Sequence, residues 1–80
     1  MLSLIRIDTR KTGEQIKNKT IEAGLTVQEL QDRLGLAAPN AIYRWYRGEA
    51  LPTLDHFVIL TEIFQTRLDD LIVLTHEKQR

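Results

Sequence analysis

The chain has 80 residues, and its 11 Lys and Arg are balanced by 11 Asp and Glu, so the formal net charge is zero. This length predicts one domain with a small core, and the neutral charge excludes a binder that relies on a strongly basic surface. The absence of cysteine excludes disulfides and thiol chemistry, and no segment resembles a transmembrane helix or a signal peptide. We therefore expect a single cytoplasmic domain over residues 1–80, with its core at about 12–72, an N-terminal arm (1–11) and a C-terminal tail (75–80).

The N-terminal arm is one of two segments with the composition of a β-strand. Residues 2–8 alternate in part between apolar and polar side chains, which is typical of a short strand or an extended arm. The other strand-like run is Leu71–Leu74, so these two segments either pair or form a hydrophobic strap that closes the domain. The tail from Thr75 to Arg80 is polar, and we expect it to be frayed.

The first helix is predicted from Thr12 to Gly24. Thr12 and Gln15 have the spacing of a capping box, and Gly24 suits the left-handed conformation found at a helix end. The inward side of this helix is predicted to carry Ile16, Thr20 and Ala23.

The second helix and the turn that follows it carry the clearest local signals in the chain. Thr26 is predicted as the N-cap, and Glu29 completes a capping box with it. Leu30 and Leu34 form an apolar pair one helical turn apart. Gly35 follows at once and can adopt the left-handed conformation that lets the chain turn sharply.

A third helix is predicted from Pro39 to Arg47 with Gly48 at its end, because proline suits the first position of a helix. At about 100° per residue, Ile42 and Trp45 fall on one side and anchor the helix. The opposite side is polar and carries Asn40, Tyr43, Arg44 and Arg47. Arginine binds guanine or phosphate, asparagine pairs with adenine and tyrosine reaches phosphate, so this side suits a DNA duplex. The arrangement is typical of a helix-turn-helix.

Two further helices are predicted after Pro52. The fourth has Thr53 as its N-cap and Asp55 near its positive end, and its wide apolar face is expected to be the centre of the core. That face comprises Leu54, Phe57, Val58, Thr61 and Phe64, widened by Ile59, Leu60 and Ile63. The fifth helix is predicted to begin at Thr66, with Asp69 as its third residue, and it offers Leu68, Leu71 and Ile72.

No catalytic, metal or cofactor motif is present in the sequence. His56 and His76 are far apart and have no carboxylate or cysteine at metal-ligand spacing. Asp69 and Asp70 are explained by their place at a helix N-terminus rather than by acid–base catalysis. We therefore expect neither an enzyme nor a bound cofactor.

The ordered set of signals over about residues 12–72 resembles the Cro/cI-like (XRE-type) helix-turn-helix family. The matching residues are Ile16, Gly24, Leu25, Thr26, Glu29, Leu30, Leu34, Gly35, Ile42, Trp45, Gly48, Pro52, Leu60 and the run from Leu68 to Leu71. The resemblance implies an all-α, five-helix bundle of the lambda-repressor type. The N-terminal strand would extend this bundle by pairing near the C-terminus. It also implies double-stranded DNA as the ligand, a bacterial or phage source and a two-fold dimer.

The chain departs from the family pattern at four places. Val27 replaces a glutamine that contacts phosphate, the segment from Gly35 to Ile42 is one residue longer, and alanines stand where a polar cap precedes the third helix. The family also pairs an arginine with an acid at the positions of Thr20 and Tyr46. Because both members of this ion pair are replaced together, we expect Tyr46 to pack on the first helix near Thr20. Replacing an ion pair by an apolar or hydroxyl contact of similar volume is often neutral.

The sequence therefore predicts a sequence-specific DNA-binding transcription regulator, a repressor that acts as a dimer with residues 39–47 in the major groove. The expected DNA-contacting residues are Gln28, Asn40, Ala41, Tyr43, Arg44 and Arg47. The dimer contact is expected over Leu68 to Leu74, with Leu4, Ile5 and Ile7 adding a strand. The alternative function is a protein-interaction module, an antitoxin or an accessory subunit built on the same fold. Each of these alternatives would require a protein partner.

Overall fold

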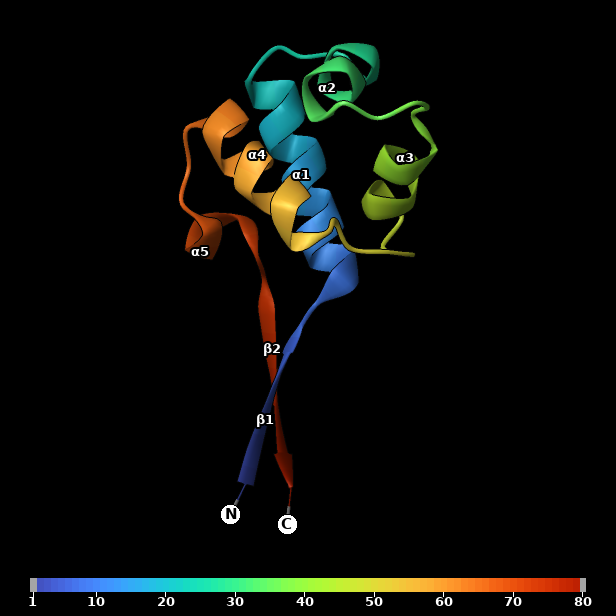
Figure 1. Ribbon diagram of the computed structural model, residues 1–80. Coiled ribbons are helices and arrows are strands. Elements are labelled where there is room, and N and C mark those ends of the chain that lie inside the picture. Colours follow the sequence, from blue (N-terminus) through green and yellow to red (C-terminus); the bar gives the residue numbers. More distant parts are fainter. Residues whose placement is uncertain (1, 80) are drawn as a thin grey trace.

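The computed structural model describes the backbone of residues 2–79 and the side chains of residues 5–76. The elements are β1 (Leu2–Ile7), α1 (Thr9–Glu22), α2 (Val27–Leu34), α3 (Asn40–Tyr46), α4 (Leu54–Phe64), α5 (Leu68–Leu71) and β2 (Leu74–Gln79). The helices form a bundle, and the two strands project from it as a narrow ribbon (Figure 1). The predicted five-helix architecture is therefore confirmed. Among the described residues, no helix is both long and apolar enough to cross a membrane.

The ribbon confirms the predicted N-terminal strand but gives it a different partner. β1 pairs in antiparallel register with β2, so that Leu2 lies opposite Gln79 and Ile7 lies opposite Leu74. The predicted partner, Leu71–Leu74, was wrong because its first residue belongs to α5 and only its last residue joins the strand. The prediction of a frayed tail was also wrong for Thr75 to Gln79, and Arg80 lies outside the described residues. These polar residues form a strand because β1 supplies a partner, and pairing overrides weak strand propensity.

The first helix begins at Thr9, three residues before the predicted start. Asp8 is its N-cap, and the Asp8 carboxylate accepts a hydrogen bond from the Lys11 backbone N–H at 2.9 Å. Thr12 is not a cap because its buried hydroxyl is used elsewhere, accepting a hydrogen bond from the Val73 N–H at 3.0 Å. The predicted capping box with Gln15 is therefore wrong. The Gln15 amide instead donates to the Asp70 carbonyl at 2.9 Å, so both side chains tie α1 to the end of α5.

The core is built from side chains of every helix. It consists of Ile16, Leu30, Leu34, Ile42, Trp45, Phe57, Leu60 and Leu71. On α1 the predicted inward residues Ile16 and Thr20 are buried, but Ala23 is exposed, and Gly13 takes its place among the buried residues. Each helix contributes one fully buried apolar side chain to the core. These residues are Ile16, Leu30, Ile42, Leu60 and Leu71.

The fourth helix packs on the core with part of the predicted apolar face. Thr53 caps it as expected, accepting a hydrogen bond from the His56 N–H at 3.2 Å. Phe57 and Leu60 are its buried residues, whereas Leu54 is 71% exposed and Val58 is 54% exposed. The expected place of α4 in the core is therefore confirmed for Phe57 and Leu60 and for the partly buried Ile59, Ile63 and Phe64, and it was wrong for Leu54 and Val58. Because α4 is apolar on nearly all sides, periodicity alone does not define its orientation.

The start of the fifth helix was predicted too early. α5 begins at Leu68, and Arg67 precedes it without a side-chain cap hydrogen bond. Thr66 does not start this helix because its N–H donates to the Thr61 carbonyl at 3.0 Å and thereby closes α4. The residue before it, Gln65, is the C-cap of α4 and adopts a left-handed conformation with φ of 51°.

Candidate nucleic-acid interface

The second helix and its turn form as the sequence predicts. The Thr26 hydroxyl accepts a hydrogen bond from the Glu29 N–H at 3.1 Å, and the Glu29 carboxylate accepts one from the Thr26 N–H at 3.0 Å. These bonds lower the pKa of Glu29, the backbone N–H being the larger cause. Gly35 has φ of 70°, which ends α2 in the expected left-handed conformation. The first half of the helix-turn-helix is therefore fixed by local interactions.

The turn between α2 and α3 is held by Gln31. Its backbone carbonyl accepts a hydrogen bond from the Leu36 N–H at 3.1 Å, and its side-chain amide donates to the Leu36 carbonyl at 3.3 Å. α3 then begins at Asn40, one residue later than predicted, because Pro39 occupies the capping position. As expected for a segment without a polar cap, no side chain caps this helix end. The Gln31 contacts stabilise the turn in place of a cap.

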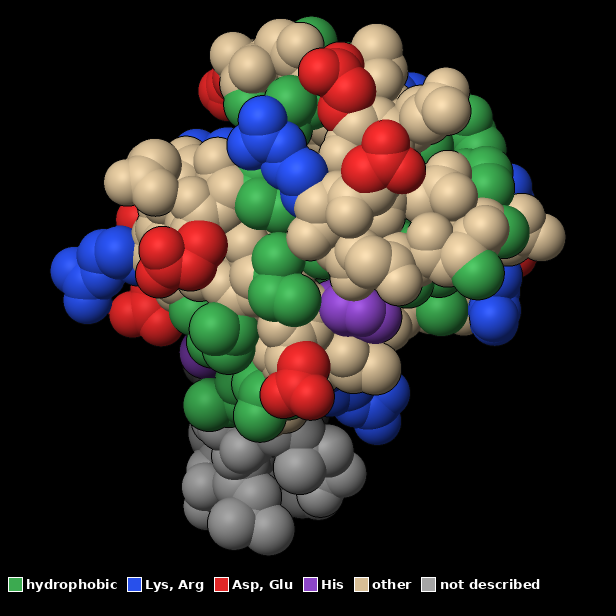
Figure 2. All heavy atoms as spheres, turned by 45° about the horizontal axis from the view of Figure 1, so that its top comes forward, with side chains coloured by type: hydrophobic (Ala, Val, Ile, Leu, Met, Phe, Trp, Pro, Cys, Tyr) green, Lys and Arg blue, Asp and Glu red, His purple; other side chains and the backbone are tan. Residues whose placement is uncertain are grey.

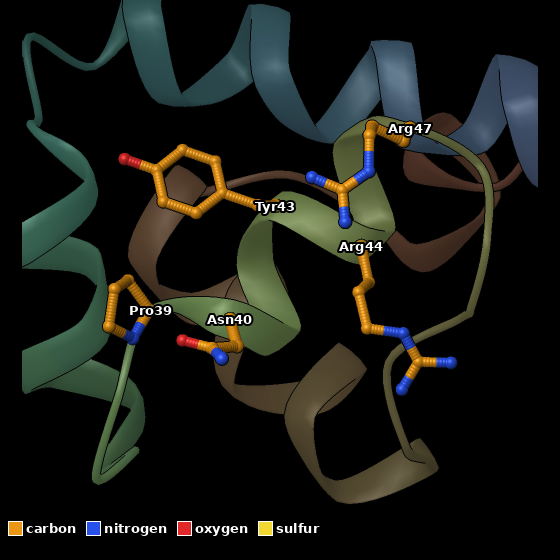
Figure 3. A pocket seen from close by; sticks show the side chains of 5 residues that line it. All are labelled: Pro39, Asn40, Tyr43, Arg44 and Arg47. Carbon is orange, nitrogen blue, oxygen red and sulfur yellow. The ribbon is translucent and has the colours of Figure 1, made fainter.

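The third helix presents one polar side to solvent. We call Asn40, Tyr43, Arg44 and Arg47 the outer face of α3. Together with Pro39 these side chains line a shallow hollow of about 270 Å³ (Figure 3). Ile42 and Trp45 on the opposite side are 0% and 3% exposed, so the predicted phase of the helix is confirmed. The anchored side holds the helix, and the four side chains of the outer face are exposed to solvent.

The remaining two expected contact residues lie away from that hollow. Gln28 is exposed on the first turn of α2. Ala41 is half-buried and packs against the core, so only part of its methyl group faces solvent. Of the six expected residues, the four of the outer face are brought together.

An acid that the sequence analysis did not single out lies at the end of the outer face. Glu49 accepts two hydrogen bonds from Arg47, one from Nε and one from Nη2, the latter at 3.2 Å. Its backbone N–H donates to the Arg44 carbonyl at 2.9 Å and holds it beside α3. The pair raises the pKa of Arg47 and lowers the pKa of Glu49, in each case mainly through their hydrogen bond. Glu49 is three residues beyond the last residue of α3, a spacing that periodicity does not connect to the outer face.

Close contact between the backbones of α1 and α3 sets the position of the outer face. Gly13 is buried, and a Cβ atom added there would lie 1.8 Å from the Trp45 carbonyl oxygen. At the end of α3, a Cβ added to Gly48 would lie 2.7 Å from the Arg10 Cα, and Gly48 has φ of 74°. Both positions therefore require glycine for space, and Gly48 requires it for its conformation as well. The sequence analysis used Gly48 as a helix end and missed Gly13 entirely.

Side chains add to this contact between α1 and α3, as the sequence predicts. Tyr46 contacts α1, with the Lys17 ammonium 6.0 Å from the centre of its ring and the Thr20 side chain beside its phenol. Burial raises the pKa of the Tyr46 phenol, and the Thr20 hydrogen bond opposes that rise. The contact with Thr20 is confirmed, although Tyr46 is half-buried rather than fully buried. His56 is also half-buried, because the centre of its ring lies 5.9 Å from the centre of the Trp45 ring.

Comparison with known proteins places this arrangement among helix-turn-helix domains. A helix-turn-helix family model (HTH_3) matches residues 16–71. No curated protein matches. The fold is similar to the restriction-modification controller protein C.AhdI from Aeromonas hydrophila, with a TM-score of 0.71 and 20% identity over 80% of this chain and 96% of that chain. It is also similar to the DNA-binding domain of BldD, with a TM-score of 0.68 and 12% identity over 82% and 94% of the two chains.

Proposed function

Since the chain belongs to the XRE-type helix-turn-helix family, we propose that it is a sequence-specific DNA-binding transcription regulator that reads its operator with α3 in the major groove. The observation that supports this most is the outer face of α3, where four polar side chains surround a hollow while Ile42 and Trp45 hold the helix from behind. A helix of seven residues presents three to four side chains to base edges, which matches this set. The restriction-modification controller protein C.AhdI and the DNA-binding domain of BldD, whose folds are similar, add support.

The chemistry of the outer face assigns a role to each side chain. Arg44 is exposed and lines the hollow, and the side-chain hydrogen bonds of Glu49 go to Arg47 instead, so the Arg44 guanidinium is the group that pairs with a guanine edge. Asn40, one turn earlier, suits adenine, which pairs with an amide through two hydrogen bonds. Tyr43 contacts a phosphate at the rim of the groove. Gln28 on α2 contacts a phosphate on the other side of the turn.

Arg47 must exchange partners to reach DNA. Its two hydrogen bonds to Glu49 have the forked geometry that it would also form with two phosphate oxygens. When α3 lies in the groove, a phosphate at the duplex surface carries a full negative charge and can replace the Glu49 carboxylate as the partner of Arg47. The exchange leaves Glu49 without its partner, so Arg47 contributes less net affinity than an unpaired arginine does. This arrangement favours selective binding over strong general attraction to DNA.

We further propose that the protein acts as a repressor and as a two-fold dimer. Repression requires only that an operator be occupied, whereas activation requires a further contact with the transcription machinery. One short helix reads only a few base pairs, and pairing two copies about 34 Å apart doubles the sequence that is read. A reporter gene placed behind the selected operator should be switched off by the protein. Increased expression would contradict the repressor assignment.

Selection of bound sequences from a random DNA pool tests the proposed function. The expected result is one enriched motif, repeated as an inverted pair with half-site centres about one helical turn apart. Recovery of sequences with no shared motif would contradict specific reading by α3. Enrichment of a single, unrepeated half-site would support sequence-specific reading by α3 and contradict the dimer.

A protein-interaction module is the second candidate, and one observation favours it. The net charge is zero and Glu49 neutralises Arg47, whereas a DNA-binding surface is usually basic. Tyrosine and arginine on an exposed helix are also common in protein interfaces. A salt titration separates the two functions, because DNA binding weakens steeply with salt through release of counterions. Binding to DNA that does not change with salt would favour the protein partner.

A further inference from the structure

Two basic side chains of α1 lie against α3. A Cβ atom added to Gly48 would lie 2.7 Å from the Arg10 Cα and 3.1 Å from the Arg10 Cβ, so Arg10 lies directly beside the residue that follows Arg47. Further along α1, the Lys17 ammonium lies 6.0 Å from the centre of the Tyr46 ring. Both side chains are exposed, and we call Arg10 and Lys17 the α1 cations. Contacts with α3 therefore fix where both α1 cations emerge.

The Tyr46 ring connects Lys17 to the outer face of α3. The rings of Tyr46 and Tyr43 meet edge to face, with their centres 6.3 Å apart and their planes at 86°. Tyr43 belongs to the outer face and is 45% exposed. The Lys17 ammonium is therefore separated from the outer face by a single half-buried ring.

The α1 cations project from the side of α1 that meets α3. At about 100° per residue, both lie within about 60° of Gly13, whose backbone is in contact with that of Trp45. They are seven residues apart, which is about two helical turns or 10.5 Å along the helix. Lys11 and Lys19 lie about 160° and 120° from Gly13 and project away from α3. Only part of the positive charge of α1 is therefore directed toward the outer face.

The α1 cations flank the edge of α3 to which the proposed function assigns phosphate contacts. Figure 3 shows Tyr43 and Arg47, the proposed phosphate contacts, on the side of α3 toward α1. Asn40 and Arg44, the proposed base contacts, lie on the other side (Figure 3). A duplex strand that passes along the first edge would therefore meet α1 next.

The acids beside the α1 cations form weak or separate pairs. The Glu14 carboxylate lies 3.8 Å from the Arg10 Nε, but the two side chains are 58% and 83% exposed, and an exposed pair of this kind is weak. Glu49 accepts its two side-chain hydrogen bonds from Arg47. On the face seen in Figure 2, Lys and Arg side chains are dispersed among Asp and Glu side chains. Their position beside α3, rather than a broad basic area, therefore suits the α1 cations to bind DNA.

We propose that the α1 cations bind phosphates of the operator strand that runs along the Tyr43 and Arg47 edge of α3. This inference rests on the proposed function and extends the DNA-binding surface from the helix-turn-helix to α1. Phosphate contacts fix the register and orientation of a protein on a duplex but carry no sequence information. Arg10 and Lys17 are therefore positioning residues, which hold α3 in the groove without selecting bases.

Charge-removing substitutions with matched controls test this inference. Arg10→Gln and Lys17→Gln each remove one α1 cation, whereas Lys11→Gln and Lys19→Gln remove the same charge from the sides of α1 that project away from α3. Affinity for the selected operator and for a duplex of unrelated sequence is measured over a series of salt concentrations. Emission from Trp45, which is buried and the only tryptophan, reports whether the helical bundle is intact.

Each lost phosphate contact should reduce the slope of log K against log salt by about 0.9, and loss of both should reduce it by about 1.8. Arg10→Gln and Lys17→Gln should weaken binding to both duplexes by the same factor and leave Trp45 emission unchanged. The two controls should keep the full slope. An unchanged slope for either α1 cation, or an equal reduction in the controls, would overturn the inference.

A charge-conserving variant separates phosphate binding from support of the Tyr46 ring. Lys17→Arg keeps the positive charge, so its slope should match that of the unchanged chain. If Lys17→Arg lost the same slope as Lys17→Gln, the effect would belong to the contact with Tyr46 and the inference would be overturned.

The inference and the proposed function fail separately in these experiments. Selection from a random DNA pool with the Arg10→Gln, Lys17→Gln double variant should recover the same motif as the unchanged chain. If the unchanged chain recovers no motif while each substitution still reduces the slope, sequence reading is contradicted and phosphate binding by α1 stands. If the motif is recovered and the slopes do not change, sequence reading stands and phosphate binding by α1 is overturned.

Discussion

Substitution of Gly13 by alanine tests how α1 positions the third helix. Alanine is the better helix former by about 1 kcal/mol, so helix propensity alone predicts a more stable protein. The structure predicts the opposite sign. A Cβ at this position would lie 1.8 Å from the Trp45 carbonyl oxygen and 2.9 Å from its carbonyl carbon, both of them backbone atoms that no rotamer change can move.

The size of the effect follows from these distances. A carbon and a carbonyl oxygen approach to about 3.3 Å, so α1 and α3 would have to separate by roughly 1.5 Å. Overpacking of this kind costs about 1–3 kcal/mol, and the gain in helix propensity offsets part of it. We expect a net loss of about 1–2 kcal/mol, which lowers the melting temperature of a domain of this size by roughly 5–15 °C. The shift of α3 should also weaken specific DNA binding.

Thermal unfolding followed by circular dichroism measures this effect, with Asn18→Ala as the control. Asn18 lies on the same helix and is exposed, so its replacement should leave the melting temperature unchanged or raise it slightly. If Gly13→Ala raised the melting temperature as the control does, the close backbone contact between α1 and α3 would be refuted.

Three further substitutions test the anchoring and the charge of α3. Trp45→Ala should lower the free energy of unfolding by about 3–5 kcal/mol in chemical denaturation, and an unchanged value would contradict its burial. Tyr46→Glu should lower the free energy of unfolding by disturbing the contact between α3 and α1, and adding Thr20→Arg should recover part of that loss. A double-mutant cycle without coupling would refute the contact between these two positions. Glu49→Gln should tighten binding to all DNA and steepen its salt dependence by up to about 0.9, whereas weaker binding would contradict competition for Arg47.

The elements that the sequence predicted best are those fixed by neighbouring residues. The capping box of Thr26 and Glu29 and the left-handed Gly35 define α2 through bonds that span three residues or fewer. The phase of α3 followed from Ile42 and Trp45 because a seven-residue helix has room for one buried side. Local chemistry and helical period were therefore sufficient for the helix-turn-helix and for the four residues of the outer face.

The errors arose where distant residues decide the structure. Thr12 has the spacing of a cap, but its hydroxyl binds Val73, which lies 61 residues away in the sequence. The polar residues of β2 become a strand only because β1 reaches them, and their register cannot be read from their own composition. α4 carries apolar side chains on nearly all sides, so packing rather than periodicity exposes Leu54 and Val58.

Two features of the interface were missed for a related reason. Glu49 lies beyond the end of α3, and its hydrogen bonds with the Arg44 carbonyl and the Arg47 guanidinium show that the chain turns back toward the outer face. Gly13 has no side chain, so an apolar periodicity pattern assigns it no role, although its backbone is in contact with that of Trp45. Both features concern how α3 is held and balanced rather than which residues it exposes.

The central claim is that the outer face of α3 reads DNA sequence, and the affinity of Arg44→Ala for a selected operator tests it most directly. Binding is measured for the unchanged chain and for the variant, on the operator and on copies with one base pair changed at each position. We expect the variant to stay folded, to lose about 1–3 kcal/mol on the operator and to stop discriminating at one position of each half-site. Equal affinity and unchanged discrimination at every position would contradict the claim.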